Sequence, residues 1–125
     1  MARIIEVPTI SDERGKLTVV DGHLPFAIKR LFYIYDVTQP RGGHRHIETQ
    51  MGLIALNGSI EIYCQTPKDD QPFILNNPAQ VLLLDPEDWH TMNKFSKGAV
   101  LLVLCSHSWN KEDYIYDSYR EIKND

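Results

Sequence analysis

The sequence predicts an all-β fold, a sandwich or barrel of short strands. Eight short segments are rich in β-branched and aromatic residues, and clusters of turn-forming residues separate them at regular intervals. Many short strands at even spacing are typical of sandwiches and barrels. The segments are residues 4–7, 16–20, 28–37, 51–56, 59–64, 73–75, 80–84 and 100–105.

The turns between these segments support the strand assignment. Residues 12–15, 68–70, 76–78 and 85–88 combine Gly, Pro, Asn and Asp in the way that turns require. Asn57-Gly58 lies directly between two apolar runs, and a type I′ turn needs positive φ at both central residues. The dipeptide therefore predicts a tight hairpin.

The C-terminal segment has a different pattern. Glu112 and Asp113 come early, and Ile115, Tyr119 and Ile122 follow at helix-like spacing. We therefore expect one short C-terminal helix after the β domain.

Length and composition limit the kind of protein. A chain of 125 residues with 42% hydrophobic content makes one domain, residues 1–125. A net charge of −4 argues against nucleic acid or a membrane surface as a partner, because both need a basic face. Cys64 and Cys105 lie in apolar runs without metal or redox spacing, so we expect buried free thiols. Without a leader or a membrane-spanning run, a cytoplasmic location fits best.

His44 and His46 are the most informative residues of the chain. Side chains alternate between the two faces of a strand, so these imidazoles point the same way while Arg45 points the other. An unperturbed histidine titrates close to neutral pH. The pair therefore predicts either a metal site or an acid/base site, and ordinary packing on a polar face is the plainer alternative.

The spacing of further residues is that of a cupin jelly roll. His44, His46, Gln50 and His90 occupy the four positions that hold a metal in metal-binding cupins. Gln50 stands where a glutamate is usual, and a neutral amide is a weaker ligand for a transition metal than a carboxylate. The metal reading is therefore weakened but stays open. His90 has packing beside Trp89 as its plain alternative.

Several cations lie in the first half of the chain and offer counter-charges to a dianionic small ligand. They are Arg14, Lys29, Arg30 and Arg41. A guanidinium is suited to bidentate contact with phosphate, although each of these residues can also be an ordinary exposed charge. Tyr33 shares a strand face with Tyr35, and its phenol is either a core group or a proton relay.

The ordered set of motifs resembles the sugar-nucleotide 3,4-ketoisomerases, also called WxcM-like or FdtA-like cupins. The resemblance runs in register over nearly the whole chain, and its most specific part is Arg41-Gly42-Gly43-His44-Arg45-His46. The other matching runs are residues 12–17, 25–34, 56–59, 89–90 and 112–115.

This resemblance implies a metal-independent jelly-roll homodimer that exchanges N-terminal strands and needs no cofactor. It also implies a reaction in which thymidine-diphosphate-4-oxo-6-deoxyglucose becomes the 3-oxo isomer, on the way to the amino-deoxysugars of bacterial surface polysaccharides. Two departures from the family pattern are Arg45, where a small residue is common, and the exchanged aromatic types at Phe32 and Tyr35.

In the family the two histidines of the motif carry the chemistry, which gives the residues here their expected roles. We expect His44 to be the base, His46 to move protons or hold the oxyanion, and Tyr33 to be a candidate donor. Arg41 is the best placed of the four cations for the pyrophosphate, because it directly precedes the site. Gln50 and His90 complete the expected substrate-binding set.

Three other functions remain open at this point. The first is a metal-dependent cupin enzyme that uses His44, His46, Gln50 and His90. The second is a nucleotide-sugar 3,5-epimerase, which exchanges protons at carbon 5 as well as carbon 3. The third is a non-catalytic module that binds a nucleotide sugar and leaves it unchanged.

Overall fold

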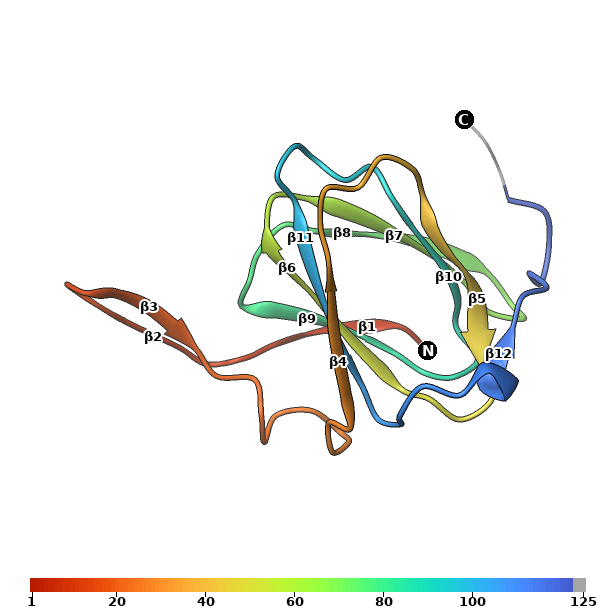
Figure 1. Ribbon diagram of the computed structural model, residues 1–125, viewed down its shortest axis with the longest axis horizontal. Helices are drawn as coiled ribbons and strands as arrows, with labels where there is room; N and C mark the ends of the chain where they lie inside the picture. The colour runs from red at the N-terminus through yellow and green to blue at the C-terminus, as the bar shows by residue number, and fades with distance from the viewer. Residues whose placement is uncertain (123–125) are drawn as a thin grey trace.

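Two antiparallel five-stranded sheets pack face to face in the computed structural model, which describes residues 1–122 (Figure 1). The first sheet has the order β1 (Arg3–Glu6), β9 (Gln80–Leu84), β6 (Met51–Asn57), β11 (Val100–Cys105) and β4 (Arg30–Ile34). The second has the order β12 (Tyr114–Ile115), β5 (Arg41–His46), β10 (Trp89–Asn93), β7 (Ile60–Gln65) and β8 (Asp70–Leu75). The predicted all-β jelly-roll class is confirmed.

The main core lies between the two sheets and follows from strand alternation. Leu53 of β6 and Leu101 and Val103 of β11 are fully buried on one side, and Ile62 of β7 faces them from the other sheet. Burial of such a side chain contributes about 1.5–3 kcal/mol. This core holds the sheets together along one side and leaves a cavity at the end of β4 and β5.

A second apolar cluster covers the outer face of the first sheet. Ile54, Val81 and Leu104 belong to its strands, and Leu24 and Phe26 come from the connection between β3 and β4. The long connection is therefore packed against the sheet.

Strand β5 approaches β10 closely at Gly42. The φ of Gly42 is +86°, and a Cβ added there would lie 2.9 Å from the carbonyl oxygen of His90. The register between β5 and β10 shifts here, and His44 is paired with His90 directly beyond the shift. Glycine is required because only it combines positive φ with this close approach.

The hairpin of β2 (Thr9–Asp12) and β3 (Gly15–Thr18) projects away from both sheets (Figure 1). Ile10 and Leu17 are paired across it and are 59% and 58% exposed. An isolated two-stranded hairpin is marginally stable by itself. Its apolar side chains therefore lack a cover within the described chain.

The predicted C-terminal helix is wrong. It forms only a single 3₁₀ turn over Lys111–Asp113, in which Asn110 caps the backbone N–H of Glu112, and Tyr114–Ile115 then pair with β5 as strand β12. Tertiary contacts override helical spacing here. Asp113 is buried, and the backbone is extended at Tyr114.

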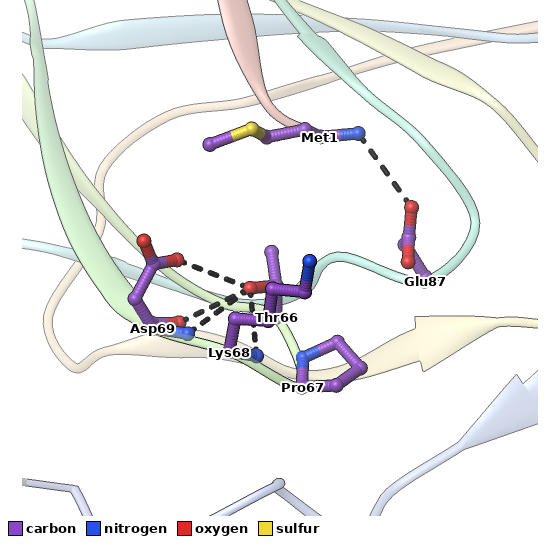
Figure 2. Close-up of a pocket in the computed structure, with 6 residues that line it drawn as sticks. All are labelled: Met1, Thr66, Pro67, Lys68, Asp69 and Glu87. Carbon is purple, nitrogen blue, oxygen red and sulfur yellow. Dashed lines mark hydrogen bonds and ion pairs between the residues drawn. The ribbon is translucent and has the colours of Figure 1, made fainter.

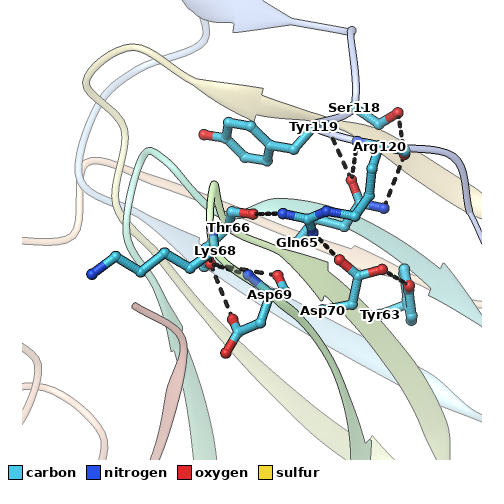
Figure 3. Close-up of polar contacts among 9 residues, drawn as sticks. All are labelled: Tyr63, Gln65, Thr66, Lys68, Asp69, Asp70, Ser118, Tyr119 and Arg120. Carbon is cyan, nitrogen blue, oxygen red and sulfur yellow. Dashed lines mark hydrogen bonds and ion pairs between the residues drawn. The ribbon is translucent and has the colours of Figure 1, made fainter.

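Beyond β12, a buried polar network fastens the segment to β7 and β8 (Figure 3). The Gln65 side chain accepts from the backbone N–H of Tyr119 at 3.0 Å and donates to the carbonyl oxygen of Arg120 at 3.1 Å. The Arg120 guanidinium contacts Asp70 and the carbonyl oxygen of Thr66. Between residues 1 and 122, no helix has the length and apolar content to cross a membrane.

Candidate active site

A cavity of about 310 Å³ opens between the ends of the two sheets and contains the predicted histidine pair. We call it the histidine cavity. Its polar lining consists of Arg30, Arg41, His44, His46 and Tyr114. Its apolar lining consists of Phe32, Ile34, Met51, Met92 and Cys105, with the backbone of Gly42 at one edge. Ligand sites commonly combine such apolar walls with a few convergent polar groups.

Strand alternation brings the imidazoles together as predicted. The ring centroids of His44 and His46 are 5.0 Å apart, and His90 lies 4.9 Å from His44 on the neighbouring strand β10. Arg45 faces away from the pair, and its guanidinium lies 5.1 Å from the ring centroid of Tyr119. The prediction that Arg45 leaves the site untouched is consistent with this orientation.

All three imidazoles are held in the neutral form. Burial lowers the pKa of His44 to about 4, with a further contribution from the nearby His46. Burial lowers the pKa of His90 to about 3. For His46, burial also lowers the pKa, while the hydrogen bond to Asp113 works in the opposite direction. Neutral imidazoles are able to accept a proton at neutral pH.

Asp113 is the direct partner of His46. Nδ1 of His46 donates to Oδ2 of Asp113 at 2.9 Å, and both side chains are buried. The same carboxylate accepts from the Thr49 hydroxyl and from the backbone N–H groups of Ile47 and Glu48. Burial alone raises the pKa of Asp113, but these hydrogen bonds outweigh it and leave the pKa below its ordinary value.

This pairing fixes the chemistry of the other ring nitrogen. With the proton on Nδ1, Nε2 of His46 is an acceptor, because a neutral imidazole has one donor and one acceptor. Nε2 is buried and has no hydrogen-bond partner within residues 1–122. An unpartnered acceptor beside a cavity is the arrangement that a general base requires.

Tyr114 supplies a phenol to the same cavity. Its ring centroid lies 4.7 Å from that of His44 and 4.8 Å from that of His46. Its hydroxyl oxygen accepts from Nη1 of Arg30 at 3.3 Å. Strand β12 places it there, since Tyr114 is paired with His46 across the sheet.

The predicted cations divide into two groups. Arg30 and Arg41 line the histidine cavity, and the Arg30 guanidinium also lies 4.6 Å from the Phe32 ring centroid. Lys29 is exposed outside the lining. Arg14 lies at the tip of the β2–β3 hairpin, where it pairs with Asp12 at 2.7 Å. The structure therefore brings two of the four cations to the histidines of the same chain.

The placement of Tyr33 is a correction. Phe32 and Ile34 face the cavity from β4, so alternation turns Tyr33 to the opposite face, where it is 60% exposed and stacks on Tyr35. The cavity therefore contains Tyr114 where the sequence analysis expects Tyr33.

His90 and Gln50 also lie outside the cavity lining. His90 is fully buried behind His44, with Nδ1 3.1 Å from the carbonyl oxygen of Asp88. Gln50 is held through its backbone, which exchanges two hydrogen bonds with Ser106. Neither residue reaches the cavity as the predicted substrate contact. Within residues 1–122, no three His, Cys, Asp or Glu side chains are arranged to hold a metal ion.

A second pocket, of about 260 Å³, lies between the N-terminus and the β7–β8 turn (Figure 2). Its polar groups are already paired with one another. Thr66 contacts Asp69 and Lys68, and the Met1 amino group lies 3.7 Å from Glu87. This pocket contains no histidine and lacks the convergent groups of the histidine cavity.

Asp113 and Tyr114 were not predicted as site residues. Both belong to the run 112–115 that carries the resemblance, but they fall in the segment that was expected to form a short C-terminal helix. The available signal was the position of an acid and a phenol in a matched motif. Only the pairing of β12 with β5 shows that they meet the histidines.

Two packed antiparallel sheets with a histidine cavity at one end form a cupin-type jelly roll with a candidate acid/base site. The model of the family described as FdtA, WxcM-like, C-terminal, matches residues 1–124. The chain belongs to this family, as its motifs predict.

Characterised relatives agree with this membership. A TDP-4-oxo-6-deoxy-alpha-D-glucose-3,4-oxoisomerase from Aneurinibacillus thermoaerophilus is 35% identical over 95% of this chain and 90% of its own. The 3,4-ketoisomerase QdtA from Thermoanaerobacterium thermosaccharolyticum, solved with TDP, has a TM-score of 0.89 at 38% identity over 93% of this chain and 88% of its own. The TDP-fucose-3,4-ketoisomerase WlaRA from Campylobacter jejuni has a TM-score of 0.88 at 39% identity, covering 93% and 89%.

A more distant neighbour shares the fold alone. The dTDP-4-dehydrorhamnose 3,5-epimerase from Bacillus anthracis has a TM-score of 0.76 at 13% identity, over 90% of this chain and 76% of its own.

Proposed function

We propose that this protein is a 3,4-ketoisomerase of a TDP-linked 4-oxo-6-deoxyhexose, in deoxyamino-sugar biosynthesis. The observation that carries the proposal is the buried pair of His46 and Asp113, which faces His44 and two arginines around one cavity. The family and the activities named for its relatives support the same reaction class.

The reaction moves a ketone from carbon 4 to carbon 3 of the sugar. A base removes the proton on carbon 3, an enediol forms, and a proton returns to carbon 4. The structure favours His46 as this base, in place of the expected His44, because Asp113 fixes the tautomer and stabilises the imidazolium that forms. Acid/base groups of this kind contribute on the order of 10²–10⁴-fold in rate.

His44 then serves at the sugar oxygens. Its pKa of about 4 makes it a weak base, but a neutral imidazole beside the cavity can hold a developing oxyanion by a hydrogen bond. His46 thus transfers the proton at carbon, and His44 stabilises the charge that develops on oxygen.

Arg30 and Arg41 are the best candidates for the diphosphate, because both line the histidine cavity. A guanidinium binds phosphate oxygens in a bidentate manner. The hairpin that carries Arg14 projects away from the sheets of its own chain (Figure 1). Arg14 can therefore contribute only to the histidine cavity of a partner subunit, and only if the hairpin extends to that subunit.

We further propose a homodimer that exchanges the β2–β3 hairpin, with each chain as one domain in the cytoplasm. Exposed apolar side chains on the hairpin, Ile10 and Leu17, match exposed ones on the outer face of β4, Leu31 and Tyr33. The free cysteines Cys64 and Cys105 suit a reducing compartment.

The test is incubation with freshly prepared TDP-4-oxo-6-deoxyglucose, followed by proton NMR in deuterated buffer. We expect a 3-oxo product with deuterium at carbon 4 and deuterium at carbon 3 of the remaining substrate, because the proton on the base exchanges with the solvent. His44→Asn should stay folded and give no isomer, and His46→Asn should also lose deuterium entry at carbon 3. Deuterium at carbon 5 indicates a 3,5-epimerase instead, and an unchanged sugar spectrum over hours indicates a binding module.

A further inference from the structure

We propose that the hydroxyl of Tyr114 transfers the proton between the two sugar oxygens during isomerisation, with Arg30 stabilising its phenolate. This inference rests on the proposed function and adds a catalytic residue to it. The sequence analysis expects a phenol at this site but assigns the role to Tyr33, which the structure turns away from the cavity.

The composition of the cavity points to Tyr114. Among the described residues that line the histidine cavity, Tyr114 alone carries a hydroxyl group. The other lining groups with an exchangeable proton are the two arginines, the two histidines and Cys105. The arginines stay protonated, and the Cys105 thiol is buried among the apolar lining groups and is a weak hydrogen-bond donor, so that neither kind of group suits a reversible transfer.

The hydrogen bond from Arg30 sets the direction in which Tyr114 acts. Nη1 of Arg30 donates to the phenolic oxygen at 3.3 Å, so the hydroxyl hydrogen is not used in this contact. It is free to be donated to a ligand. After donation, the guanidinium lies beside the phenolate and stabilises its charge in a partly buried site.

Tyr114 is held against both histidines of the cavity. Its ring contacts His44 and His46 at nearly equal centroid distances, 4.7 Å and 4.8 Å. Asp113, the preceding residue, is bound to His46, and β12 is paired with β5. One short segment therefore positions the base and the phenol together.

The proton balance of the reaction needs such a group. As His46 takes the proton from carbon 3, the electrons form a carbon–carbon double bond and leave a negative charge on the oxygen at carbon 4, and in a following step this oxygen takes the Tyr114 proton. The Tyr114 phenolate then takes the proton from the hydroxyl at carbon 3, the ketone forms there, and the His46 imidazolium returns its proton to carbon 4. The enzyme ends in its starting state, and no oxidant or reductant is consumed.

Packing is the alternative role for Tyr114, because its ring stacks on Tyr116 at 6.2 Å and lies against both histidines. The variant Tyr114→Phe separates the two roles, since it keeps the ring and removes only the hydroxyl. Tyr116→Phe is the matched control, because Tyr116 is 68% exposed and lies outside the cavity lining.

The experiment measures three quantities for wild type, Tyr114→Phe and Tyr116→Phe: kcat for the TDP-4-oxo sugar, deuterium entry at carbon 3, and the Kd for TDP. For Tyr114→Phe we expect kcat to fall by about 100-fold or more while the Kd and the deuterium entry persist. Tyr116→Phe should match wild type in all three.

The other outcomes overturn the inference in distinguishable ways. A Tyr114→Phe enzyme within about threefold of wild type removes Tyr114 from the chemistry. A variant that binds TDP but loses deuterium entry along with turnover assigns Tyr114 to the carbon step instead of the oxygen step. If wild type itself leaves the sugar unchanged, the proposed function fails and the role of Tyr114 fails with it.

Discussion

Asp113 and His46 lie 67 positions apart in the chain, yet the carboxylate accepts a hydrogen bond from the imidazole Nδ1 at 2.9 Å in a buried contact. The contact forms because β12 pairs with β5 and draws the end of the 3₁₀ turn against the histidine strand. It leaves Nε2 of His46 as an unpartnered acceptor beside the cavity. The orientation of the proposed base is therefore set by a residue outside the cavity lining.

Replacing Asp113 tests this positioning role. In Asp113→Asn the amide can place its NH₂ toward His46 and so favour the tautomer with the proton on Nε2, which is unable to accept a proton from carbon 3. We expect kcat to fall by about 10²–10⁴-fold with little change in KM. Steady-state kinetics on the TDP-4-oxo sugar measures the effect.

The control for this variant is Glu112→Gln, which removes an adjacent but exposed carboxylate. It should keep the wild-type kcat. A pH profile adds a second readout, because loss of the Asp113 charge removes an influence that raises the pKa of His46. The acid limb of kcat/KM should then move to lower pH; an unchanged limb and an unchanged kcat contradict the positioning role.

The two adjacent glycines of β5 offer a matched pair of variants. Both have a φ of +86°, but a Cβ at Gly42 meets the backbone of His90 at 2.9 Å, whereas a Cβ at Gly43 meets nothing within 4 Å. Gly43→Ala should cost about 1–2 kcal/mol of unfolding free energy from backbone strain alone. Gly42→Ala should cost at least about 1 kcal/mol more, because β5 must move away from β10.

Urea unfolding measures both free energies, and the kinetics of the folded variants measures the effect on the site. Gly42→Ala should lower kcat as well, since it displaces His44 from His90. Equal destabilisation of the two variants shows that the close approach at Gly42 is unimportant.

The sequence predicts the fold class and the histidine pair because both depend on short-range rules. Strand alternation alone places His44 and His46 on one face and Arg45 on the other. The tight hairpin predicted at Asn57-Gly58 is wrong: the chain turns there, but β6 and β7 belong to different sheets and are not paired, and Asn57 lacks the positive φ of a type I′ turn. Tyr33 was expected at the site from the resemblance and the chemistry of a phenol, and strand alternation turns it to the opposite face from Phe32.

The missed residues depend on long-range pairing that local patterns do not contain. Asp113 and Tyr114 lie in a segment whose apolar residues follow helical spacing, but the hydrogen bonds of the buried Asp113 carboxylate and the pairing of β12 with β5 decide where both residues lie. His90 was expected at the substrate because it follows the cupin spacing. The structure places it one layer deeper, behind His44, where burial keeps it neutral.

Because the histidines are buried, we expect the free energy of unfolding to decrease as the pH is lowered. The pKa of His44 is about 4 and that of His90 about 3 in the folded state, below the ordinary value of 6.5. Below this ordinary pKa, the unfolded chain therefore binds protons at these imidazoles while the folded chain does not. The free energy of unfolding decreases as the pH falls, until the folded pKa values are reached. Burial raises the pKa of Asp88, so the folded chain binds a proton there more readily than the unfolded chain. This opposes the loss of stability at the acid end of the range.

Urea unfolding between about pH 7 and about pH 4 measures this slope. His90→Gln removes one of the contributing imidazoles and should reduce the slope even though the variant is less stable. A free energy of unfolding that stays constant across this range is incompatible with neutral buried imidazoles.

The exposed hairpin predicts a subunit contact. Leu17 is 58% exposed on a hairpin that projects away from both sheets of its own chain (Figure 1). With Ile10, its partner across the hairpin, it forms an exposed apolar patch of the kind that marks an interaction site. Leu17→Glu places a charge in the proposed dimer contact, so we expect the dimer to dissociate and kcat to fall if Arg14 of one chain serves the other. The control is Ile74→Glu, because Ile74 is similarly exposed, at 54%, on the distant strand β8. Sedimentation velocity should then show monomers for Leu17→Glu and dimers for wild type and Ile74→Glu, while a wild-type monomer removes the exchanged hairpin from the proposal.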